Sequence, residues 1–213
     1  ESGPIKIKDG DLKIKLNSDI SLESNFLTNL RYNDKFKNYQ DLIKSSELAK
    51  NITNIEIDLN NSFFIIFDKT YKVKEFNYKN NGKIKKADLE FKRSFENSLL
   101  EEQIKQFSII NSEIQTNFSP KKNTISIFGK YSLNKSNFLS FNLERVVKKE
   151  ILKLKLNADY DKFIQLDFIN YQKPKNLIGN FSVNLEKQKD NIKIENLNFI
   201  EGKNSFKING LNF

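Results

Sequence analysis

Alternation of apolar and polar residues runs through almost the whole chain and constrains its fold more than any other feature. The stretch NFSVNLEKQKDNIKIENLNF, residues 180 to 199, places an apolar residue at nearly every second position on both sides of a lysine-rich turn. Successive side chains of a β-strand point to opposite faces, so this period predicts strands with one apolar and one polar face. Short connections favour antiparallel pairing. The sequence therefore predicts a protein of the all-β (mainly β) class.

The alternating segments follow one another as a long meander over residues 1–213, which we interpret as a single domain. Three dipeptides are predicted to form turns between strands, namely Asp9-Gly10, Asn60-Asn61 and Asn81-Gly82. A change of parity before Phe76 predicts a β-bulge, and the parity shifts again between Ile84 and Ala87. The three prolines are expected at strand ends or in loops, where a missing N–H leaves the sheet intact.

Two short helices are expected in addition to the strands. Within residues 33 to 50, apolar residues recur at spacings that fit an amphipathic helix packed on the sheet. Ser98-Leu-Leu-Glu101 has the spacing of a capping box and predicts a helical turn from about Leu99 to Phe107. The same residues fit an edge strand as well. Two short helices are too few to cover a dozen strands.

The apolar face of the sheet must be buried, and two solutions remain open. A second sheet packed on the first would give a closed β-sandwich, whose core is filled by its own side chains. Alternatively, the meander curls into an open groove, a "β-taco", in which acyl chains replace the missing layer, because each buried methylene stabilises the complex by about 0.8 kcal/mol. For aromatic residues such as Phe141 and Phe199, packing in a core and contact with a ligand are both consistent with the pattern.

Composition argues against catalysis, metal binding and nucleic-acid binding. The chain contains neither Cys nor His, so the commonest metal ligands and general bases are missing. Asp159 and Asp161 are interpreted as solvated turn residues, since no calcium loop surrounds them. The net charge of +9 comes almost entirely from scattered lysines, which indicates a solvated face rather than a nucleic-acid footprint. We therefore expect a protein that is not an enzyme and takes no cofactor, no metal and no nucleic acid.

The C-terminal third of the chain resembles a known family. Residues 167 to 213, DFINYQKPKNLIGNFSVNLEKQKDNIKIENLNFIEGKNSFKINGLNF, combine a strand, a loop with Tyr171, Lys173 and Pro174, a strand beginning at Gly179, a polar turn and an IKIENLNF strand. This arrangement is similar to the repeating unit of the AsmA-like superfamily, which includes AsmA, TamB and YhdP, and the YhdP-like branch fits best. The resemblance is clearest over residues 137 to 213.

The resemblance implies a non-enzymatic segment of a longer envelope protein that binds phospholipid acyl chains. The parent protein is expected to be anchored in the inner membrane, to contact membranes through its other parts, and to extend through the periplasm toward the outer membrane. A rival hypothesis is a lysine-rich bacterial surface or adhesion protein built as a closed β-sandwich. The side chains expected to line the groove share the apolar parity of their strands: Leu139, Phe141, Leu143, Leu152, Leu154, Leu156, Ile164, Leu166, Phe168, Phe181, Val183, Leu185, Ile192, Ile194, Leu197, Phe199, Phe206 and Ile208.

Overall fold

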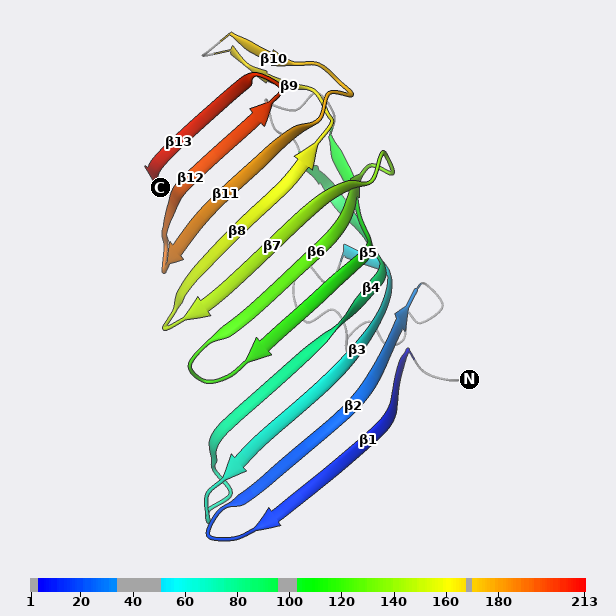
Figure 1. Ribbon diagram of the computed structural model, residues 1–213, viewed down its shortest axis with the longest axis vertical. Coiled ribbons are helices and arrows are strands. Elements are labelled where there is room, and N and C mark those ends of the chain that lie inside the picture. Colours follow the sequence, from blue (N-terminus) through cyan, green and yellow to red (C-terminus); the bar gives the residue numbers. More distant parts are fainter. Residues whose placement is uncertain (1–3, 34–50, 96–102, 168–169) are drawn as a thin grey trace.

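The computed structural model describes residues 4–33, 51–95, 103–167 and 170–213, and most of these lie in β-strands (Figure 1). The strands in these ranges are β1 (Ile5–Leu16), β2 (Ile20–Tyr32), β3 (Ile52–Phe67), β4 (Val73–Phe95), β5 (Ile104–Phe118), β6 (Asn123–Leu133), β7 (Leu139–Lys148), β8 (Ile151–Tyr160), β9 (Ile164–Leu166), β10 (Tyr171–Lys173), β11 (Gly179–Gln188), β12 (Asn191–Glu201) and β13 (Asn204–Asn212). The predicted all-β class is confirmed.

Eleven of these strands form a single sheet in the order β1-β2-β3-β4-β5-β6-β7-β8-β11-β12-β13. Every neighbouring pair is antiparallel, as the short connections predicted. Strands β9 and β10 pair only with each other, so β11 returns to the sheet beside β8. The sheet does not close into a barrel, and β1 and β13 lie at its two opposite edges (Figure 1).

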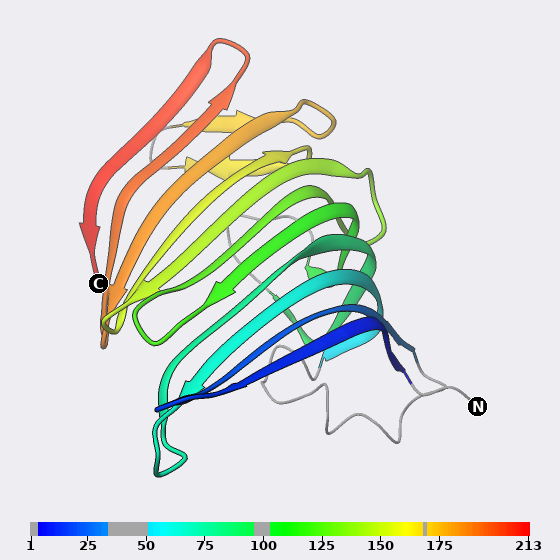
Figure 2. The same cartoon turned by 60° about the horizontal axis from the view of Figure 1, so that its bottom comes forward.

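The sheet is open and strongly curled, and Figure 2 shows several strands bending along their length. Extra residues interrupt the pairing register at Asp9 and Gly10 in β1, at Lys85 in β4, and at Asn111 and Ser112 in β5. A β-bulge bends its strand and increases the local twist, so these interruptions account for the curl. The parity changes noted before Phe76 and between Ile84 and Ala87 coincide with register shifts between β3 and β4.

The three predicted turn dipeptides are wrong, because each lies inside a continuous strand. Asp9-Gly10 is the bulge of β1, where Asp9 has a positive φ of 49°. Asn60-Asn61 lies in the middle of β3 and Asn81-Gly82 in the middle of β4. At Gly82 a Cβ atom would lie 2.0 Å from the backbone oxygen of Asp58, so glycine is required there by close packing of strands rather than by a turn.

The predicted helical turn from Leu99 to Phe107 is also wrong where the structure describes it. Residues 104 to 107 begin strand β5, which pairs on one side with β4 and on the other with β6. Phe107 pairs with both neighbouring strands, and the backbone N–H groups of Lys105 and Gln106 donate to the Asn134 side chain, so partners distant in sequence override the local helical signal. Residues 34–50, which carry most of the other predicted helix, lie outside the described residues.

A closed β-sandwich is not what the described strands form, because they build one large open sheet and one small hairpin. The accessible surface area is 14439 Å², whereas a compact monomer of the same mass has about 10,000 Å². Among the described residues, a buried cluster of Tyr131, Phe141 and Ala158 lies on the apolar face of β6 to β8, surrounded by half-buried neighbours such as Phe107 and Leu143. Most of the apolar face therefore keeps partial access to solvent.

The β9–β10 hairpin packs on one end of the apolar face. The ring of Tyr171 lies edge-on to Phe199 with centroids 6.1 Å apart. Lys173 is fully buried; its Nζ donates hydrogen bonds to the backbone oxygens of Lys162 and Pro174, at 2.7 and 3.1 Å, and burial lowers its pKa.

Asp161 is only 6% exposed and accepts a hydrogen bond from Asn137, so its interpretation as a solvated turn residue is wrong.

Docking of the hairpin is expected to weaken at alkaline pH through Tyr171. Its hydroxyl donates a 3.0 Å hydrogen bond to Glu201, and burial together with that carboxylate raises the pKa of Tyr171 from 10.0 to about 12. Between these two values the unfolded chain loses a proton that the folded chain keeps, so the free energy of unfolding falls as pH rises. Denaturation followed by circular dichroism should show wild type about 1 kcal/mol more stable than Tyr171→Phe at pH 8. The gap should shrink toward pH 12; an unchanged gap would contradict this assignment.

Candidate functional site

One face of the large sheet carries apolar side chains in continuous rows, and we call it the inner face. Residues paired across antiparallel strands project to the same side, so the pairing register identifies these rows. One row from β7 to β13 consists of Phe141, Ala158, Phe181, Phe199 and Phe206. The next row along the strands consists of Leu143, Leu156, Val183, Leu197 and Ile208.

The inner face is the concave face of the curled sheet. The β9–β10 hairpin lies on the concave side (Figure 2), and its Tyr171 contacts Phe199 of the inner face. Strand β8 shows how differently the two faces are exposed. Leu154 and Leu156 are half-buried on the inner face, whereas Lys153 and Lys155 are exposed on the opposite, outer face.

Fifteen of the eighteen residues expected to line the groove lie on the inner face of the large sheet. Ile164 and Leu166 instead belong to β9 in the small hairpin, where Ile164 is buried. Phe168 lies outside the described residues. The remaining residues share the face as follows: Leu139, Phe141, Leu143, Leu152, Leu154, Leu156, Phe181, Val183, Leu185, Ile192, Ile194, Leu197, Phe199, Phe206 and Ile208.

A bulge in β12 explains how residues of opposite parity share this face. Leu185 pairs with Ile194, and Val183 pairs with Leu197, so the register shifts by one residue between them. Glu195 is the extra residue. Because the shift restores the alternation, Ile194 and Leu197 both project to the inner face.

The inner face also carries a polar strip that the list of expected groove residues did not contain. Asn61 of β3, Asn80 of β4 and Thr116 of β5 are successive partners in the register. The next partners are Ile125 of β6 and Arg145 of β7. We call Asn61, Asn80, Thr116 and Arg145 the polar strip. A signal for one member was present in the sequence, because LSFNLERVVK gives Arg145 the parity of its apolar neighbours.

The members of the polar strip differ in how their hydrogen-bonding groups are satisfied. Asn61 is 4% exposed, and its amide nitrogen donates to the Phe26 oxygen and to the Thr28 hydroxyl. Its amide oxygen accepts a 2.7 Å hydrogen bond from the Tyr78 hydroxyl. By contrast, Oδ1 of Asn80 and Oγ1 of Thr116 are buried without a hydrogen-bond partner. An unsatisfied buried polar atom costs free energy, of the order of 1–3 kcal/mol.

The outer face is a solvated surface of lysines and acidic residues. Lys85 lies 2.6 Å from Asp58, and Lys153 lies 2.8 Å from Glu186. The Lys85 ammonium holds the pKa of Asp58 below its usual value, and Lys153 does the same for Glu186. All four side chains are substantially exposed, so these ion pairs add little stability.

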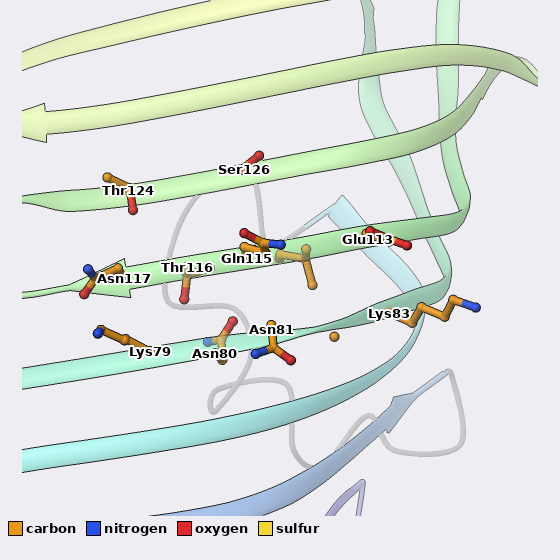
Figure 3. A pocket seen from close by; sticks show the side chains of 12 residues that line it. Lys79, Asn80, Asn81, Lys83, Glu113, Gln115, Thr116, Asn117, Thr124 and Ser126 are labelled. Carbon is orange, nitrogen blue, oxygen red and sulfur yellow. The ribbon is translucent and has the colours of Figure 1, made fainter.

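A polar hollow of about 570 Å³ opens over β4, β5 and β6 (Figure 3). Lys79 and Asn81 of β4, Gln115 of β5 and Ser126 of β6 contribute to its lining, and these residues have outer-face parity. Lys83 and Glu113, which also line it, are cross-strand partners. Asn80 and Thr116 of the polar strip line the hollow as well, and the amides and hydroxyls of this lining can form hydrogen bonds with a polar ligand.

The part of the chain that the structure describes contains neither a cluster of metal ligands nor a helix that could span a membrane. In these ranges, acidic side chains do not form a group of three that could hold a metal ion, and the chain has no His or Cys. Within the same ranges, helices of the length and apolar character needed to span a membrane are not found. Comparisons with protein-family models, curated proteins and solved structures yielded no match.

Proposed function

We propose that this chain is a lipid-binding segment of an AsmA-like envelope protein. In this proposal the groove shields phospholipid acyl chains while they move between the inner and outer membranes. The segment works without catalysis, in the periplasm, as part of a parent protein anchored in the inner membrane. The observation that carries the proposal is the set of apolar rows on the inner face of an open, curled sheet, which no second sheet covers within the described residues.

The energetics favour hydrocarbon as the ligand of this face. The side chains of the row containing Leu156 and Val183 are half-buried in the free protein, so an acyl chain lying along them removes further apolar area from water. Burial of a methylene group contributes about 0.8 kcal/mol, and several such groups suffice for binding without polar recognition. The lysines of the outer face keep the opposite side of the sheet in water.

The proposal is tested by identifying what the protein carries. We expect the 213-residue chain, expressed in bacteria and purified under native conditions, to co-isolate phospholipid that mass spectrometry detects. The same protein washed in urea and refolded without lipid should lack it and should bind it again from detergent-solubilised phospholipid. Absence of phospholipid from the native preparation together with failure to take it up after refolding would refute the proposal.

A further inference from the structure

Arg145 is a cation on the apolar inner face. It follows Leu143 by two residues on β7, pairs with Ile125 of β6 on one side, and pairs with Leu154 of β8 on the other. Val147 follows at the next inner position of the same strand. Arg145 is half-buried, so an aliphatic environment surrounds the base of a charged side chain.

The described residues around Arg145 supply no carboxylate partner for its charge. Within the described residues, no carboxylate lies at ion-pair distance from its guanidinium, whereas Arg31 on the outer face lies 3.2 Å from Glu56. Partial burial of an unpaired charge is unfavourable, and a leucine at this position would continue the apolar row. A bound anion would therefore provide the guanidinium of Arg145 with the partner that the described residues lack.

The neighbouring polar strip adds a second observation at the same place. Thr116 is separated from Arg145 only by Ile125 in the register, which places their strands about 10 Å apart. The Thr116 hydroxyl and the Asn80 amide oxygen are buried without partners. The two polar groups without partners and the cation thus lie in one line of the register, and the row of Leu143 and Leu156 runs beside Arg145.

We propose that Arg145 binds the phosphate of a phospholipid whose acyl chains lie on the adjacent apolar rows. This inference rests on the proposed function and specifies its ligand as a lipid with an anionic phosphate. A guanidinium donates two parallel hydrogen bonds to two phosphate oxygens, a geometry that a lysine ammonium does not offer.

The test compares two lipids that differ only in the phosphate-containing head group. An equimolar mixture of dioleoylphosphatidylglycerol and dioleoylglycerol in detergent is offered to the refolded, lipid-free protein, and native mass spectrometry measures the ratio of the two complexes. Wild type should prefer the phospholipid by about tenfold, as expected for charge-assisted hydrogen bonds. Arg145→Leu should lose this preference while still binding dioleoylglycerol.

Lys155→Leu is the matched control, because it removes the same charge from the outer face beside Leu154 and should keep the preference. Equal loss in both variants, or equal binding of the two lipids by wild type, would overturn the inference and leave the proposed function standing. Binding of neither lipid by wild type would instead refute the proposed function. Inorganic phosphate alone should bind far more weakly than the phospholipid; equal affinity would assign the site to free phosphate and overturn the inference.

Discussion

Val183→Asp is expected to deprive the protein of its bound lipid and to lower its free energy of unfolding by about 3 kcal/mol. Val183 lies on the inner face of β11, between Leu156 of β8 and Leu197 of β12. A carboxylate there is placed among aliphatic side chains with no cation beside it in the row, so it disfavours both the curled sheet and an acyl chain lying on it. Mass spectrometry of the purified variant measures the first effect, and urea denaturation measures the second.

Asn184→Asp provides the control one residue along the same strand. Asn184 projects to the outer face, where its partners are Lys155 and Asn196, so a carboxylate there meets water and a neighbouring lysine. Its stability should stay within about 0.5 kcal/mol of wild type and its lipid content should be unchanged. Leu154→Asp and a Lys153 substitution form an equivalent pair on β8. Equal effects from the two faces would contradict the assignment of the inner face.

Gly82→Ala is expected to destabilise the protein by about 3 kcal/mol, because the added methyl group has no space. A Cβ atom at this position would lie 2.0 Å from the Asp58 oxygen and 2.9 Å from the Cα of Leu59. Both contacts are with the backbone of β3, which cannot move without breaking its pairing with β2 and β4. Thermal denaturation followed by circular dichroism checks the prediction.

Gly10→Ala distinguishes this close approach from a general intolerance of larger residues at glycine positions. A Cβ atom at Gly10 would lie 3.5 Å from Cβ of Phe26, an ordinary van der Waals contact, and β1 is exposed at the edge of the sheet. The Gly10 variant should therefore stay within about 0.5 kcal/mol of wild type. If Gly82→Ala were as mild as Gly10→Ala, strands β3 and β4 would be less closely packed than described.

Alternation along the chain determined the class of fold and the composition of the inner face. In LKLKLNA of β8, the two-residue period is imposed by the pleat of any β-strand, whatever its partners. Within one strand, such as Leu152, Leu154 and Leu156 of β8, apolar residues could therefore be assigned to one face before their partners were known, whereas Ile194 and Leu197 share a face because of the bulge at Glu195. The same periodicity gave Arg145 inner-face parity, although an isolated charge within an apolar row has meaning only once its surroundings are known.

Turns, helices and the polar strip depended on tertiary structure. Asn81-Gly82 has the local chemistry of a hairpin, yet β4 continues through it because the neighbouring strands satisfy its backbone and leave room only for glycine. Ile164 and Leu166 have the alternation of the large sheet but belong to a separate hairpin, since a pattern of side chains does not specify a pairing partner. The alignment of Asn80, Thr116 and Arg145 arises from the register of four different strands. Register follows from cross-strand hydrogen bonds and bulges, which act between distant segments, so local sequence patterns do not specify it.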